Sequence, residues 1–209
     1  MTISLPDLVE ALLDGVRPLP IVIAGDPVLR NPAAPYDGQL TAAQLDRLVL
    51  AMRETMHAAP GVGLAAPQVG IPLRLAVLED PAEVTDEIRA ARVRVPLPFR
   101  VLVNPTYEPI GATHATFFEG CLSVPGWQAV VARHARVRLR GQDERGRELD
   151  EEVTGWPARI VQHETDHLDG TLYIDSAVTR SLTSTQAMAE HWSQPTPAAA
   201  GKALGFDWP

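Results

Sequence analysis

The five residues His163-Glu164-Thr165-Asp166-His167 constrain the fold more than any other segment, because they spell HExxH. Histidines four residues apart share one face when the segment is helical. From that face two imidazoles can bind one divalent metal ion, and the glutamate between them can take a proton from a bound water. The segment therefore predicts a helix that carries a metal site. Two solvated histidines on a surface helix are the alternative.

The flanking residues fit a helix that begins near Thr154 and ends near Gly170. Thr154 offers a capping hydroxyl, Pro157 falls in the first turn, and Gly170 follows the second histidine as a C-cap residue. Ile160 falls on the same stripe as both histidines. This context favours the metal site over a solvated helical face.

A third metal ligand is required, and its position distinguishes classes of HExxH enzyme. The downstream sequence follows the long metzincin pattern as far as Gly170, but Tyr173 stands where that pattern requires a histidine. No downstream segment supplies the glutamate that thermolysin-like proteases use. The third ligand is therefore expected upstream.

Cys121, the only cysteine, is the candidate for that ligand. A lone cysteine is usually a small buried apolar residue. Here it lies between Gly120 and small polar neighbours, where a glycine lets the backbone approach a metal closely. One thiolate, two imidazoles and a water form a tetrahedral catalytic site with one open position.

The glycine-rich segment 61–68, GVGLAAPQ, is the third candidate for the site. An ordinary helix-to-strand turn after Pro60 is the simplest interpretation. The segment lacks the Lys-Ser/Thr ending of a phosphate loop. Its small residues would let a backbone run beside an extended peptide, and Gln68 could direct an amide N–H at a developing oxyanion.

In this order and at these separations, GVGLAAPQ, EGCLS (residues 119–123) and HExxH resemble the three signature motifs of the peptide deformylases. The similarity covers about residues 20–175, so that residues 1–19 are expected to be an N-terminal extension. Residues 176–209 are expected to be a C-terminal appendage, for which packing on the domain and partial disorder are the two alternatives.

The resemblance implies that the protein removes the formyl group from the N-terminal formyl-methionine of newly synthesised proteins and releases formate. It implies one Fe²⁺ per chain, for which nickel, cobalt or zinc can substitute. The metal ligands would be Cys121, His163 and His167. Glu164 would transfer the proton, while the Gln68 amide and the Leu122 backbone N–H would hold the oxyanion.

The resemblance also assigns substrate-binding positions. The backbones of Gly63 and Gly120 would align the peptide as an added strand. The methionine pocket would be formed by Val62, Phe117, Trp156, Ile160 and His163. Trp156 and Arg159 stand where some members have aliphatic residues, which leaves the width and polarity of this pocket open. Glu119 and Arg133 are expected to form an ion pair that orients the Cys121 loop; two unconnected surface charges are the alternative.

The pattern of elements predicts an α+β fold with mostly antiparallel sheets around a central helix that carries HExxH. Helices are expected from Ser4 to about Val16 and from Thr41 to Pro60, the second with a Thr41–Gln44 capping box. A solvated loop with one helical turn is expected over residues 79–98. Strands are expected over 73–78, 99–103, 113–118 and 129–140, with a return strand after Gly146.

Length and charge restrict the remaining possibilities. The 209 residues suit one domain, and a net charge of −8 excludes a general binder of nucleic acid or anionic membranes. No apolar run could span a membrane, and no secretory signal is present. The unpaired thiol and the missing signal indicate the cytoplasm. Formylated nascent peptides are the expected partners, with a transient ribosome contact left open. The alternatives are an HExxH zinc endopeptidase and a non-catalytic peptide-binding protein.

Overall fold

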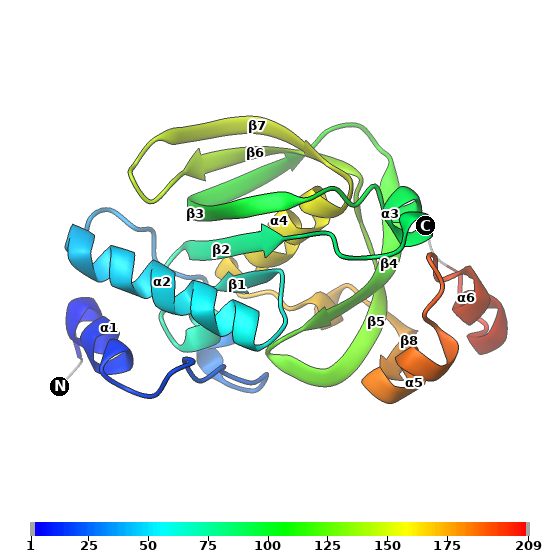
Figure 1. The fold of residues 1–209 in the computed structure, drawn as a ribbon, viewed down its shortest axis with the longest axis horizontal. Coiled ribbons are helices and arrows are strands. Elements are labelled where there is room, and N and C mark those ends of the chain that lie inside the picture. Colours follow the sequence, from blue (N-terminus) through cyan, green and yellow to red (C-terminus); the bar gives the residue numbers. More distant parts are fainter. Residues whose placement is uncertain (1–2, 208–209) are drawn as a thin grey trace.

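Helix α4 (Gly155–Leu168), which carries HExxH, lies at the centre of the fold (Figure 1). The computed structural model describes residues 3–207. Two antiparallel sheets pack on α4, one five-stranded in the order β1-β2-β3-β6-β7 and one three-stranded in the order β4-β5-β8. The predicted α+β class is confirmed. The strands are β1 (Gly63–Ala65), β2 (Leu75–Asp80), β3 (Leu97–Pro109), β4 (His114–Cys121), β5 (Val124–His134), β6 (Arg136–Gln142), β7 (Glu148–Thr154) and β8 (Val178–Ser184).

The five-stranded sheet is covered on both faces, because successive residues of its central strands point to opposite sides. Val77 and Val101 join the core beneath α2 (Ala42–Ala58), against which α1 (Leu5–Leu13) packs. Their neighbours Leu78 and Leu102 join the core around α4. Each fully buried aliphatic side chain of this kind contributes about 1.5–3 kcal/mol to folding. The five-stranded sheet therefore packs against α2 on one face and against α4 on the other.

The helix starts show which local signals the fold uses. Ser4 caps α1. The predicted capping box of α2 is present: the Thr41 side chain accepts from the Gln44 backbone N–H, and the Gln44 side chain accepts from the Thr41 backbone N–H. Thr154 is the N-cap residue of α4, but the expectation that its hydroxyl caps the helix is wrong. The first amides of α4 donate instead to carbonyls of other segments, Gly155 to Ala135 and Trp156 to Val93. Tertiary backbone contacts thereby replace the side-chain cap.

The segment predicted as one strand over residues 129–140 is two strands in different sheets. β5 ends at His134 and pairs with β4, whereas β6 begins at Arg136 and pairs with β3 and β7. The chain changes sheets at Ala135, whose N–H donates to the carbonyl of Thr113. Odd-numbered residues are buried on both strands, at 129, 131 and 133 and again at 137 and 139, so the alternation continues across the break and gives no sign of it.

The segment 79–98 contains α3 (Asp86–Arg92), capped by Thr85, in agreement with the predicted short helix. Residues 176–207 form regular elements, which favours the packed appendage over the partly disordered one. β8 pairs with β5, and α5 (Thr185–His191) and α6 (Ala198–Leu204) follow it (Figure 1). Phe206 is buried against Phe118 of the three-stranded sheet.

Short 3-10 helices occur at Pro27–Leu29, Ala66–Val69 and Tyr173–Asp175. No helix within residues 3–207 is long and apolar enough to cross a membrane.

Candidate active site

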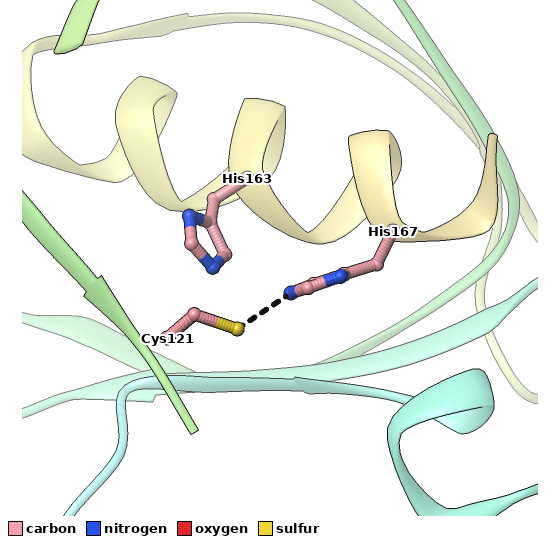
Figure 2. Close-up of side chains that lie close together, drawn as sticks. All are labelled: Cys121, His163 and His167. Atoms are coloured by element: carbon pink, nitrogen blue, oxygen red, sulfur yellow. Dashed lines mark hydrogen bonds between the residues drawn. The ribbon is translucent and has the colours of Figure 1, made fainter. Parts of the chain in front are cut away.

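The structure brings Cys121, His163 and His167 together, as the motif analysis predicted (Figure 2). Their ligand atoms all lie within 4.8 Å of one another, and the Cys121 Sγ is 3.3 Å from the His167 Nε2. The histidines come from α4, and the cysteine comes from the last residue of β4. Within residues 3–207 this is the one group of three or more such side chains. One soft and two borderline donors at this spacing fit a divalent transition metal.

The electrostatics of the two histidines also fit a cation. Burial, together with the neighbouring His163, lowers the pKa of His167 well below its usual value and leaves its imidazole neutral. Burial likewise lowers the pKa of His163, but its contacts with Cys121 and Glu119 outweigh this and raise the pKa well above the usual value. The surroundings of His163 therefore favour positive charge, which a metal ion can supply in place of a proton.

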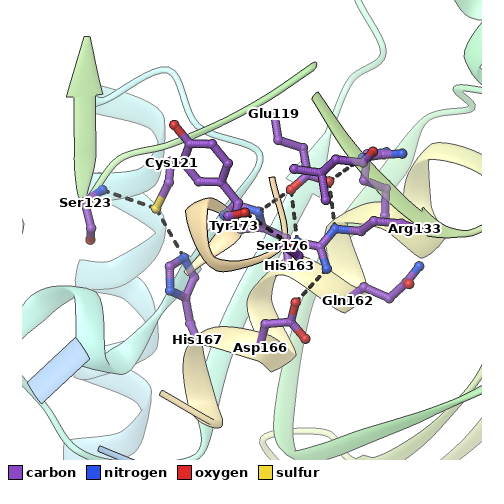
Figure 3. Close-up of polar contacts among 12 residues, drawn as sticks. Glu119, Cys121, Ser123, Arg133, Gln162, His163, Asp166, His167, Tyr173 and Ser176 are labelled. Atoms are coloured by element: carbon purple, nitrogen blue, oxygen red, sulfur yellow. Dashed lines mark hydrogen bonds and ion pairs between the residues drawn. The ribbon is translucent and has the colours of Figure 1, made fainter. Parts of the chain in front are cut away.

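Glu119 orients His163 and belongs to a buried ionic network (Figure 3). Its Oε2 lies 3.0 Å from the His163 Nδ1, which leaves the Nε2 free for a metal. The predicted Glu119–Arg133 ion pair is confirmed, with a nitrogen–oxygen distance of 2.7 Å. Arg133 makes a second ion pair, with Asp166, at 2.6 Å. Arg159 donates to the same Glu119 carboxylate. Burial opposes the charge of Glu119, but Arg133 and His163 outweigh it and hold the pKa of this carboxyl well below its usual range.

Glu164 lies beside the metal group and is buried. Its Oε2 has no hydrogen-bond partner among the described residues. Burial raises the pKa of its carboxyl to about 7. Gly63 makes room for this side chain, because a Cβ at that position would lie 2.1 Å from the Glu164 Oε1. A buried carboxyl with a free oxygen and a raised pKa is suited to accept and return a proton at neutral pH.

Gln68 is held in one orientation by contacts at both ends of its amide. The Oε1 accepts from the Ala65 N–H at 2.8 Å, which assigns the Nε2 to the other side. The Nε2 lies 3.5 Å from the Cys121 Sγ and 3.3 Å from the Ser123 Oγ. The amide N–H groups thus face the metal group. A donor fixed in this way can stabilise negative charge that develops there.

A cavity of about 680 Å³ opens onto these groups, and every predicted site residue lines it except Phe117 and His167. Phe117 lies behind Trp156, with ring centroids 6.0 Å apart, and His167 is buried beneath the metal group. Two sheet edges border the cavity, because β1 with Gly63 and β4 with Gly120 are both terminal strands. Edges of this kind can accept an extended peptide as an additional strand.

The sequence analysis missed several residues that line the cavity. Gln128 lies opposite Gly120 across the β4–β5 pair, and Trp127 precedes it. Arg92 reaches the cavity from α3, and Thr185 reaches it from the start of α5. The register of the β4–β5 pair shifts between Gly120 and Cys121, so a regular hairpin through Cys121 and Val124 would not pair Gln128 with Gly120. Nothing in the sequence places Arg92 or Thr185 there.

Tyr173, which replaces the third histidine of metzincins, is not a metal ligand. Its ring stacks on His163 at 6.4 Å, and its hydroxyl donates to the Trp127 carbonyl at 3.0 Å. Burial raises the pKa of the phenol to about 12, so that it stays protonated at neutral pH. Tyr173 therefore packs against the metal group, and the candidate for the third ligand is Cys121.

Comparisons with known proteins agree with this site. The profile of the polypeptide deformylase family matches residues 18–182. The chain belongs to the peptide deformylase family. It is 70% identical over 207 residues to peptide deformylase 1 of Streptomyces coelicolor, covering 99% of this chain and 95% of that protein. It is 69% identical to peptide deformylase 3 of Streptomyces avermitilis, covering 98% of this chain and 92% of that protein.

A solved structure of a peptide deformylase from Synechococcus elongatus, in complex with actinonin, superposes with a TM-score of 0.65 at 32% identity. The superposition covers 92% of this chain and 89% of that one. The protein is therefore a metalloenzyme that removes the formyl group from the N-terminus of newly made proteins. The comparisons give no support to the zinc endopeptidase alternative.

Proposed function

We propose that this chain performs deformylation with Cys121, His163 and His167 as metal ligands and Glu164 as the group that transfers the proton. The observation that carries the proposal is that Cys121, His163 and His167 converge at the cavity that Glu164 lines, where the Glu164 Oε2 has no partner among residues 3–207. A divalent ion at this position supplies a Lewis acid and makes water acidic enough to react at neutral pH.

The side chains divide the chemistry between them. Glu164 takes a proton from the water that attacks the formyl carbon, and it gives a proton to the amine as the C–N bond breaks. The Gln68 Nε2 and the Leu122 backbone N–H donate to the oxygen that becomes negative in the transition state. A single donor of this kind is worth about 3–4 kcal/mol of transition-state stabilisation. The products are formate and a free amino terminus.

The substrate is proposed to enter as an extended strand between the two sheet edges. The backbones of Gly63 on β1 and Gly120 on β4 would pair with it. The methionine side chain would occupy the part of the cavity lined by Val62, Trp156, Ile160 and His163, with Phe117 packed against Trp156. We also propose that actinonin, which the Synechococcus structure contains, occupies this cavity.

We propose Fe²⁺ as the physiological ion, one per chain, with nickel, cobalt or zinc as substitutes. A thiolate with two imidazoles can bind all four ions, so these donors support a divalent transition metal.

We propose a cytoplasmic location, supported by the similarity to the two Streptomyces proteins and by the unpaired thiol. A transient contact with the ribosome is proposed from the nascent substrate. Residues 20–175 are proposed as the catalytic part.

One assay tests the function directly. Formate release from formyl-Met-Ala should be rapid, whereas an unformylated peptide with internal bonds only should stay intact. Cleavage of the internal peptide without formate release would replace the proposal with an endopeptidase. Metal content after purification without oxygen identifies the ion, and zinc as the sole metal would contradict the iron proposal.

A further inference from the structure

The outer end of the cavity holds an unusual concentration of positive charge on two aromatic rings. The guanidinium carbons of Arg92, Arg94 and Arg159 lie 5.1, 5.2 and 5.5 Å from the centre of the Trp156 ring. Arg92 and Arg159 also lie 5.5 and 5.3 Å from the centre of the Phe117 ring. Three cations around one indole repel one another unless carboxylates offset their charge.

Two of the three arginines have such a carboxylate. Arg94 makes a two-pronged ion pair with the buried Asp80, at 2.8 and 2.9 Å, and Arg159 donates to Glu119. Arg92 has no carboxylate within 4.0 Å in the described part of the chain. The Arg92 Nε donates to the Pro195 carbonyl at 3.3 Å, which leaves the N–H groups of both terminal nitrogens available to a ligand.

A second donor in the same corner of the cavity is also unsatisfied. The Trp156 Nε1 is buried without an acceptor among residues 3–207, and Arg92 lines the cavity beside it. Burial and the nearby Arg94 and Arg159 lower the pKa of Arg92 to about 10, so the guanidinium remains charged at neutral pH. A ligand carboxylate here would offset the charge of Arg92.

The spacing along α4 shows which part of a substrate would reach this corner. Trp156 precedes His163 by seven residues, which places it on the same helical face and about 10 Å farther from the metal group. A formyl group at the metal puts the third residue of an extended peptide at about that distance, because each residue adds about 3.3 Å. Side chains one and three of a strand also point to the same side. The third side chain would therefore lie next to the methionine pocket, at Arg92.

We infer that Arg92 forms an anion subsite that selects substrates with aspartate or glutamate as the third residue. The inference rests on the proposed function, since it assumes a formylated peptide bound along the cavity. It also gives the terminal segment a role, because Pro195 holds the Arg92 side chain and Thr185 lines the same cavity.

The test compares kcat/KM for formyl-Met-Ala-Glu-amide and formyl-Met-Ala-Gln-amide, whose third side chains differ mainly in charge. The wild-type enzyme should favour the glutamate peptide about threefold to fivefold, as expected for a partly exposed ion pair. Arg92→Gln should bring the ratio to about one. Arg89→Gln is the matched control, because Arg89 lies on the same helix, pairs with Asp86 and does not line the cavity. That control should keep the wild-type ratio.

A wild-type ratio near one, or a preference that survives Arg92→Gln, overturns the inference. So does a charge preference that appears only at the second residue, in formyl-Met-Glu-Ala-amide against formyl-Met-Gln-Ala-amide. If Arg92→Gln does not fold, the salt dependence of the wild-type enzyme tests the inference instead. The ratio of kcat/KM for the glutamate peptide to that for the glutamine peptide should fall towards one between about 0.05 and about 0.5 M NaCl. A ratio that does not change with salt overturns the inference. Failure of the metal-loaded wild type to release formate from any peptide would refute the proposed function itself.

Discussion

Gly63→Ala tests whether the position of the Glu164 carboxylate limits the reaction. The added Cβ would lie 2.1 Å from the Glu164 Oε1, 2.5 Å from the Cδ and 2.7 Å from the Cγ, whereas ordinary contact begins at 3.4 Å. The carboxylate must therefore move by about 1 Å, and a displacement of that size costs about 10²-fold in rate. The protein should still fold, because the clash involves the end of a flexible side chain and no backbone.

The assay measures kcat for formate release together with metal content and thermal stability. We expect kcat to fall about 10²-fold while the metal stays bound. A double-mutant cycle isolates the cause: in a Glu164→Ala background the methyl group has room, so Gly63→Ala should cost less than about threefold there. Retention of wild-type kcat by Gly63→Ala would refute the reasoning. A loss of the same size in both backgrounds would show that Gly63 acts on something other than Glu164.

The remaining predictions concern the metal group and its support. Cys121→Ser or His163→Ala should lose bound metal and activity together, and full metal occupancy by elemental analysis would remove that residue from the site. Glu164→Gln should keep metal and fold but lose about 10²–10⁴-fold in kcat, so a loss below about tenfold would contradict its role. The iron-loaded enzyme should lose activity in air, and mass spectrometry should detect oxygen atoms added to Cys121. The nickel form should keep a reduced thiol. Glu119→Gln should destabilise the fold by about 3–5 kcal/mol in denaturant titrations, because two buried arginines lose their carboxylate. The folded pKa of Glu119 is lowered, so this difference should be complete above about pH 4.3, the unfolded value, and shrink as the pH falls below it. A difference that shrinks at alkaline pH would contradict the assignment.

The sequence predicted the site better than the outer parts of the fold. Metal ligands and proton-transfer groups need particular side chains at particular spacings, so the convergence of Cys121, His163 and Glu164 could be predicted directly. The change of sheets at Ala135 could not, because both sheets demand the same apolar alternation. The capping of α4 was also misjudged, since its first amides donate to carbonyls distant in sequence, including that of Ala135.

The position of Arg92 shows a second limit of the sequence. Its segment reads as a solvated, charged loop, and its charge and short helix fit that interpretation. Only the folded chain reveals that the carbonyl of Pro195, 103 residues away, holds the side chain at the cavity. Likewise, residues 176–207 contain few large apolar side chains, yet β8 becomes ordered by pairing with β5. The position of the Arg92 side chain and the pairing of β8 both depend on contacts between segments that are distant in the sequence.

The candidate metal ligands belong to different layers of the fold, which has a consequence for how the layers hold together. Cys121 ends a strand of the smaller sheet, and His167 lies 46 residues away on the central helix. A shared ion would therefore act as a cross-link, in a chain whose single thiol cannot form an internal disulfide. Chelation should loosen the β4–β5 hairpin first, and hydrogen exchange of its amides should quicken before that of β2 and β3.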